Sequence, residues 1–116
     1  MKLDLHLHST ASDGSDSPSR IVELAKEKGI DVISLTDHDT VGGVPEALEA
    51  GKKLGVKVVR GVELSAFSSY EVHVLGYNID VKSAALNGKL EELREKRIAR
   101  AHKILDKLET FNINLD

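Results

Sequence analysis

The chain has 116 residues, with 16 Lys+Arg against 19 Asp+Glu for a formal net charge of −3, and it has five His and no Cys. This composition is typical of one small globular domain and excludes disulfide bonds and thiolate metal sites; we expect a cytoplasmic protein with no membrane partner. The mildly acidic balance and an aromatic content of 3% argue against duplex nucleic acid as a partner.

The chain opens with the pattern of a strand, a loop, a helix and a second strand. Residues 2–7 alternate between apolar and polar side chains, which predicts a strand with its leucines in the core. A polar loop over 9–17 leads to a helix over 18–29, which begins with proline and ends with glycine. A β-branched run over 30–35 predicts the second strand.

The second half continues this alternation and ends in a long helix. A helix is predicted over 44–54, strands over 56–65 and 70–77, and a long amphipathic helix over 83–108. The β-α-β-α-β order predicts an α/β fold with parallel strands, in units of about 30 residues as in (β/α) barrels. A closed eightfold barrel needs about 250 residues, so we expect part of a barrel or an open α/β unit.

Polar side chains gather where the predicted parallel strands end, which is where functional groups meet in such folds. His6 and His8 are two residues apart on the first strand, so both imidazoles point the same way in a chelating arrangement. For an isolated His-x-His pair, two ordinary half-buried histidines are the better interpretation. The acidic and histidine residues at two further strand ends reverse that preference in favour of a metal site.

The second strand ends in Asp37-His38-Asp39, and the third carries Glu63. Two carboxylates beside one imidazole repel each other unless a cation is present, so we interpret His38 as a metal ligand oriented by Asp37 or Asp39. Glu63 falls on a mostly apolar face of its strand, where a carboxylate needs a partner, and a position bridging two cations fits this need. Asp13 is by itself better explained as a turn residue, with a metal ligand as the alternative.

Other polar residues have simpler interpretations when each is taken alone. His73, in the middle of the fourth strand, is better explained as a structural histidine, and His102 as a solvated residue of the last helix. Arg94, Arg97 and Arg100 on that helix would pair with neighbouring glutamates. Their functional alternative is a phosphate clamp, since guanidinium groups bind phosphate bidentately.

Taken together, the motifs resemble those of the PHP (polymerase and histidinol phosphatase) superfamily. Five stretches carry the resemblance in family order: residues 4–9, 12–14, 35–40, 61–65 and 73–77. The Thr-Asp-His-Asp-Thr run, the fourth strand and the arginine-rich helix most resemble one branch. That branch holds the nucleoside 3′,5′-bisphosphate phosphatases and the related 5′→3′ oligoribonucleotide exonucleases.

The resemblance implies a distorted (β/α)7 TIM-like barrel with up to three divalent metal ions, Mn, Fe or Zn, at its mouth. It implies six metal ligands: His6 and His8 for the first ion, Glu63 bridging the first and second, His73 for the second, and Asp13 and His38 for the third. Among these, His6, His8, His38 and Glu63 would be catalytic. Arg94, Arg97 and Arg100 are candidates for contacts with substrate phosphate.

The function implied is a metal-dependent phosphoesterase that hydrolyses a phosphomonoester of a small nucleotide-type substrate, a nucleoside 3′,5′-bisphosphate or a short oligonucleotide. A histidinol-phosphatase-like activity and a polymerase-associated module are the enzymatic alternatives. The family completes its site with a further His and an Asp-x-His pair, and nothing after His73 matches them. A truncated, non-catalytic metal-binding fragment is therefore a third alternative.

These considerations predict how the chain is organised. We expect the N-terminal portion of a PHP barrel over 1–80, carrying the metal site, and a helical segment over 81–116 that begins an inserted or substrate-side region. If the natural chain is this short, its strand edges and apolar faces favour association into a homo-oligomer.

Overall fold

All the elements predicted from the sequence are present in the computed structural model, which describes residues 1–115. The elements are β1 (Leu3–Leu7), α1 (Pro18–Glu27), β2 (Val32–Leu35), α2 (Val44–Leu54), β3 (Lys57–Phe67), β4 (Glu71–Tyr77) and α3 (Ala84–Glu109). The Ser17 side chain caps α1 and Ser83 caps α3, each by accepting a hydrogen bond from a backbone N–H of the first turn.

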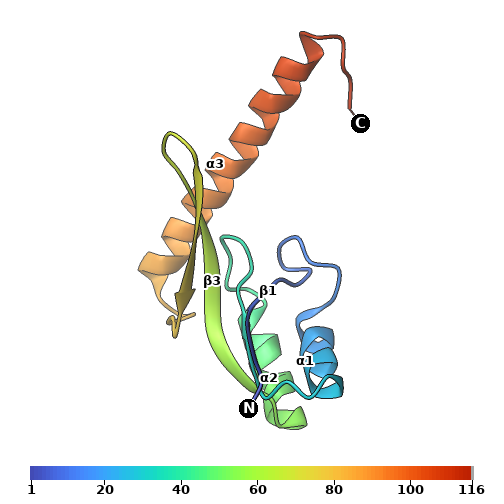
Figure 1. The fold of residues 1–116 in the computed structure, drawn as a ribbon. Coiled ribbons are helices and arrows are strands. Elements are labelled where there is room, and N and C mark those ends of the chain that lie inside the picture. The colour runs from blue at the N-terminus through green and yellow to red at the C-terminus, as the bar shows by residue number, and fades with distance from the viewer. Residues whose placement is uncertain (116) are drawn as a thin grey trace.

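The four strands form one sheet in the order β1-β2-β3-β4 (Figure 1). β1, β2 and β3 are parallel, which confirms the pairing expected from the β-α-β-α-β order, and β4 returns antiparallel to β3. The sheet is curled like part of a barrel. The Tyr77 hydroxyl of β4 donates a hydrogen bond of 2.8 Å to the Leu5 carbonyl of β1, so the curl brings the first and last strands together.

Apolar side chains of α1 and α2 cover the convex face of the sheet. They form one cluster with the apolar residues of the strands: Ile21, Val22, Ala25, Ile33, Leu35, Ala47 and Val56. Leu7 packs against this cluster as predicted, but Leu3 is exposed because it lies near the start of the edge strand β1. Within residues 1–115, no helix combines the length and apolarity needed to cross a bilayer.

A second apolar cluster anchors α3. Leu90 packs there with Val41, Val44 and Val62, and it is the only residue of α3 that is buried among those described. The distal part of the helix projects away from the sheet (Figure 1) and exposes residues such as Ile98. The helix was predicted to be amphipathic over its whole length, but only its first turns find apolar partners in the described chain.

The concave face of the sheet carries the polar side chains that alternate with the core residues. Val58 and Val62 of β3 pack toward the helices. Glu63 and Ser65 therefore point to the opposite face, because successive residues of a strand alternate. This is the face on which the sequence pattern placed Glu63.

Gly61 of β3 packs directly against side chains of β2 and of the residue that follows it. A Cβ atom at this position would lie 2.3 Å from Ser34 Oγ and 2.8 Å from Thr36 Cγ2. We therefore expect Gly61→Ala to lower the free energy of unfolding by about 1–3 kcal/mol, measured by urea denaturation. Gly88→Ala in α3 is the matched control. A Cβ at Gly88 meets nothing within 4 Å, so this change is expected to stabilise by about 0.5–1 kcal/mol. Equal effects of the two changes would contradict the close approach.

Candidate metal centre

The six predicted ligands come from five separate segments and meet at one end of the concave face. β1 contributes His6, and His8 follows directly after this strand; the loop between β1 and α1 contributes Asp13, the segment after β2 contributes His38, and β3 and β4 contribute Glu63 and His73. The backbone brings two of them together, because the segment after β2 forms a parallel bridge with β3 at His38 and Glu63.

The Glu63 carboxylate is the centre of this cluster, and its side chain is only 5% exposed. Oε1 lies 3.2 Å from His6 Nε2 and 3.4 Å from His73 Nδ1. Oε2 lies 3.2 Å from His8 Nε2 and 3.1 Å from His38 Nδ1. A single buried carboxylate thus faces four imidazole rings.

Asp13 closes the cluster from the loop side. Its Oδ1 lies 3.3 Å from His8 Nδ1, and its Oδ2 lies 3.3 Å from His38 Nε2. The loop reaches this position because Gly14 packs directly on the end of β1, where a Cβ would lie 2.3 Å from the His8 carbonyl oxygen. The Asp-Gly pair is therefore a turn that also carries a carboxylate to the histidines.

Several atoms of the cluster lack the bonds that burial normally requires. His8 Nδ1, His38 Nδ1 and Glu63 Oε2 are buried and have no aligned hydrogen-bond partner within residues 1–115. Each of these atoms instead lies 3.1–3.3 Å from a nitrogen or oxygen atom of another residue of the cluster. Imidazole nitrogens and carboxylate oxygens are the donor set of Mn, Fe and Zn, so the residues fit divalent metal ions.

The ligand atoms divide into three overlapping groups, and within each group they lie within 4.8 Å of one another. The groups are His6, His8 and Glu63; His8, Asp13 and His38; and His38, Glu63 and His73. The first group agrees with the ligands that the family resemblance assigns to one ion. The second group shares His8 with the first group and His38 with the third. Such shared side chains suit a compact multinuclear site.

Burial lowers the pKa of His38 below its ordinary value, while the charges of Glu63 and Asp13 act in the opposite direction. The His38 side chain is 9% exposed. Because the lowering prevails, the imidazole is neutral at pH 7 and keeps a lone pair for a metal ion.

Asp37 bonds to the loop after β1 and not to the His38 ring. Its carboxylate accepts hydrogen bonds from the Ser9 backbone N–H at 2.6 Å, from the Ser9 hydroxyl at 2.7 Å and from the Ser12 hydroxyl at 2.7 Å. These donors satisfy a carboxylate that is almost fully buried. Asp37 therefore fixes the loop that carries Asp13.

Asp39 connects β3 with α3. The residue has a left-handed backbone with φ of 51°, and its Oδ1 accepts a 3.0 Å hydrogen bond from the Ser65 backbone N–H. Its Oδ2 lies 3.5 Å from Arg97 Nη1, and its carbonyl accepts a hydrogen bond from Arg94. The structure thus gives both predicted orienting carboxylates other partners, because the His38 ring nitrogens face Glu63 and Asp13.

Glu71 belongs to the same cluster, although sequence patterning does not single it out. It lies two residues from His73 on the same face of β4, and its Oε1 is 3.2 Å from His73 Nε2. A hydrogen bond with His73 holds the pKa of Glu71 below its ordinary value. A carboxylate on the far nitrogen orients the ring, so that His73 Nδ1 faces Glu63.

Glu71→Gln is expected to weaken divalent metal binding about 10- to 100-fold, because partners of ligating histidines contribute that much to metal affinity. Titration with Mn²⁺ followed by calorimetry measures the change. Glu92→Gln is the matched control, since Glu92 lies on α3 and pairs with Lys89 and Lys96. An unchanged affinity in Glu71→Gln would show that this carboxylate does not position His73.

The three arginines of α3 extend toward the strand ends. Arg94 pairs with Glu91, as predicted, and also reaches Asp39, whereas Arg100 lies 3.5 Å from Glu71 of the hairpin. A cavity of about 260 Å³ lies between α3 and the cluster, with Asp13 and His38 on one side and Arg94 and Arg97 among its other walls. His102 is exposed on α3, as expected.

The sequence of the chain matches a known family. The profile described as the PHP domain matches residues 4–109. The chain belongs to the PHP domain family. The resemblance found in the motifs is therefore confirmed over most of the sequence.

Curated relatives of this PHP chain act on phosphate esters, according to their names. A 5′-3′ exoribonuclease of Haemophilus influenzae is 41% identical over 97% of the chain and 41% of its own length. A phosphoribosyl 1,2-cyclic phosphate 1,2-diphosphodiesterase of Eggerthella lenta is 38% identical over 97% of the chain and 44% of its own length. A 3′,5′-nucleoside bisphosphate phosphatase of Chromobacterium violaceum is 37% identical over 96% of the chain and 39% of its own length. The PHP chain thus spans about two fifths of these relatives.

Solved structures support the same fold. An amidohydrolase from Chromobacterium violaceum, solved with bound sulfate and no metal, superimposes with a TM-score of 0.89 at 35% identity, over 99% of this chain and 41% of that one. A proposed metal-dependent phosphoesterase from Bifidobacterium adolescentis has a TM-score of 0.85 at 29% identity, over 95% of this chain and 39% of that one. The α/β part-barrel and its long last helix therefore match about two fifths of each of these two solved chains.

Proposed function

We propose that the protein is a metal-dependent phosphoesterase that hydrolyses a phosphomonoester of a nucleotide-type substrate. The observation that carries this proposal is the buried Glu63 carboxylate among four imidazoles, with Arg94 and Arg97 of α3 lining the cavity beside His38. The ligand cluster suits Mn, Fe or Zn, and guanidinium groups suit phosphate. The names of the Haemophilus and Chromobacterium relatives support a nucleotide-type substrate.

Each part of the cluster has a role in this proposal. Bound divalent ions would supply positive charge to the phosphoryl oxygens. They would also lower the pKa of a bound water molecule, so that hydroxide is available at neutral pH. Glu63 would hold two of the ions together, and the neutral His38 would offer a lone pair from a fixed ring. Arg94 and Arg97, which line the cavity beside His38, would bind phosphate oxygens and orient the ester. Asp37 and Asp39 would keep the loop and α3 in place.

The test is phosphate release from adenosine 3′,5′-bisphosphate by the purified protein with Mn²⁺. We expect release that falls at least about 100-fold in His38→Ala, because the variant loses a ligand and with it the charge that stabilises the transition state. His102→Ala is the control, since this exposed histidine lies outside the cluster. Equal turnover in all three proteins would exclude the proposal.

A parallel set of substrates separates the alternatives. Histidinol phosphate tests the histidinol-phosphatase-like activity, and a cyclic phosphodiester of ribose tests the activity named for the Eggerthella relative. Tight Mn²⁺ binding without turnover of any substrate would indicate a metal-binding module.

A further inference from the structure

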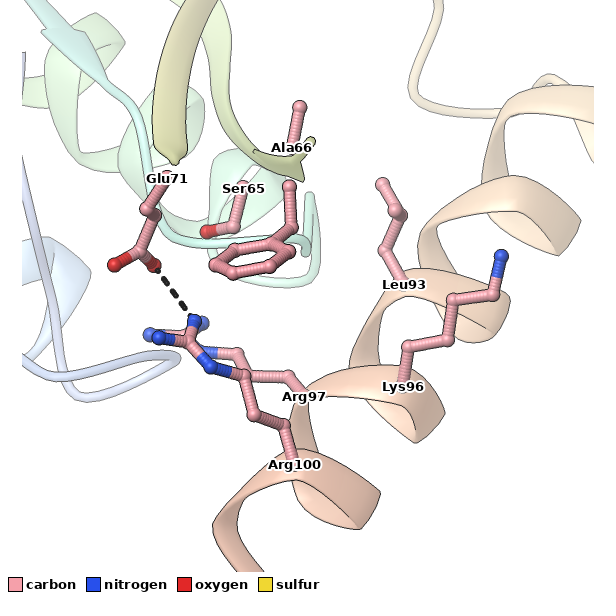
Figure 2. A pocket seen from close by; sticks show the side chains of 8 residues that line it. Ser65, Ala66, Glu71, Leu93, Lys96, Arg97 and Arg100 are labelled. Atoms are coloured by element: carbon pink, nitrogen blue, oxygen red, sulfur yellow. Dashed lines mark ion pairs between the residues drawn. The ribbon is translucent and has the colours of Figure 1, made fainter. Parts of the chain in front are cut away.

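A pocket of about 290 Å³ lies between the β3–β4 hairpin and α3, beside the metal ligands (Figure 2). Figure 2 shows Arg97 and Arg100 reaching from the helix toward Ser65 and Glu71 of the hairpin, with Leu93 farther along the helix. The volume is near the lower limit for pockets that hold small ligands, so it suits one ring system.

Phe67 gives this pocket an aromatic wall. Phe67 is 65% exposed, so its ring is open to a ligand. The Arg100 guanidinium carbon lies 4.7 Å from the ring centroid, and Glu71, directly opposite Phe67 in the hairpin, holds that guanidinium. A planar cation over an exposed aromatic ring is a surface on which nucleic acid bases stack.

The pocket adjoins the histidine and Glu63 cluster through two of its lining residues, Glu71 and Arg97. Glu71 Oε1 contacts both Arg100 of the pocket wall and His73 of the cluster, at 3.5 Å and 3.2 Å. Arg97 lines this pocket and also the cavity beside His38. A ligand whose phosphate lies at the cluster would therefore place its adjoining part in this pocket.

One wall also offers an unused hydrogen-bonding group. Ser65 Oγ is buried and has no hydrogen-bond partner among the described residues. An unpaired buried hydroxyl beside a ligand-sized pocket is the kind of polar group that fixes the orientation of a ligand.

We propose that this pocket binds the nucleobase of the substrate, stacked against Phe67 and Arg100. The assignment rests on the proposed phosphoesterase function and adds the residues that would bind the base of its nucleotide-type substrate. A free phosphate or a bare sugar phosphate would use the arginines but would leave the exposed surface of the Phe67 ring and Leu93 without an apolar ligand group. In this assignment the base packs against the apolar side chains of the pocket, and the phosphate pairs with the positive charge of the arginines.

Two ligands with the same phosphate test this assignment: adenosine 5′-monophosphate and ribose 5-phosphate, titrated calorimetrically in the presence of EDTA. Stacking of one base on an aromatic residue predicts that the nucleotide binds about 5- to 100-fold more tightly than the sugar phosphate. Phe67→Leu is expected to bring the two affinities within about twofold, and Phe67→Tyr to restore the preference. Tyr70→Leu removes another exposed aromatic of the hairpin and should leave the preference unchanged.

The results separate this inference from the proposed function, because EDTA removes the metals that catalysis needs. Equal affinities for both ligands, no measurable nucleotide binding at millimolar concentration, or a preference that survives in Phe67→Leu would overturn the base site. Each of these results would leave the phosphate-release experiment to decide the function. A preference lost only in Phe67→Leu would establish the site even if no phosphate is released.

Discussion

Glu63→Gln is expected to abolish tight divalent metal binding, with a loss of more than about 100-fold in affinity. Changes at residues that only orient a ligand cost about 10- to 100-fold, and Glu63 faces four histidines directly. Glutamine keeps the shape but removes the negative charge and replaces one oxygen acceptor with an NH₂ donor. Two of the three ligand groups lose their carboxylate in this variant.

Elemental analysis of the dialysed protein and calorimetric titration with Mn²⁺ measure this effect. Glu23→Gln is the matched control, because Glu23 is an exposed residue of α1 whose carboxylate pairs with Arg20. Circular dichroism establishes that both variants are folded. A Glu63→Gln protein that binds the same amount of Mn²⁺ with wild-type affinity would show that the cluster does not hold metal through this carboxylate.

Leu90→Ala is expected to be the most destabilising single change in α3, lowering the free energy of unfolding by about 2–5 kcal/mol. Leu90 is 0% exposed and packs with Val41, Val44 and Val62, so its removal leaves a cavity where the helix meets the sheet. Domains of this kind have only about 5–15 kcal/mol of stability, so the loss is a large fraction of the total.

Urea denaturation of the Leu90→Ala protein measures this loss, and Ile98→Ala provides the comparison. Ile98 lies on the same helix and is exposed, so its truncation is expected to change stability by no more than about 0.5 kcal/mol. Similar losses in the two variants would mean that the apolar contacts of α3 do not depend on its first turns.

The strand ends of the site were predictable because the rules that place them are local. Alternation along a strand puts His6 and His8 on one face, and parallel pairing brings the ends of successive strands to one edge. His38 and Glu63 follow from the same two rules. Their roles as metal ligands remain predictions that the variants above test.

The residues of β3 that lie opposite His73 and Glu71 of the antiparallel strand β4 could not be predicted from the sequence. The register pairs Ser65 with His73 and Phe67 with Glu71. That register depends on the hairpin turn, which the apolar pattern of β4 does not determine. His73 taken alone therefore had no predicted partner and entered the site only through the family resemblance, and Glu71 was not predicted at all.

The partners of Asp37 and Asp39 could not be derived from the sequence. A carboxylate accepts bonds from any donor that the fold brings near it. Here the nearest donors are Ser9, Ser12 and the Ser65 backbone, which lie at least two dozen residues away in the sequence. The exposed distal part of α3 is a similar case, because an apolar period indicates a buried face without indicating what covers it.

The hydrogen bond from Tyr77 to Leu5 joins residues 72 positions apart, and this has a consequence for how the protein is made. Translation proceeds at about 5–20 residues per second, so His6 leaves the ribosome on the order of ten seconds before His73. Until then the nascent chain offers an incomplete cluster, because Glu63 lacks its contact with His73. For the proposed metal site, the full set of ligands therefore forms only when the sheet curls shut, and the choice between competing metal ions would be made at that moment.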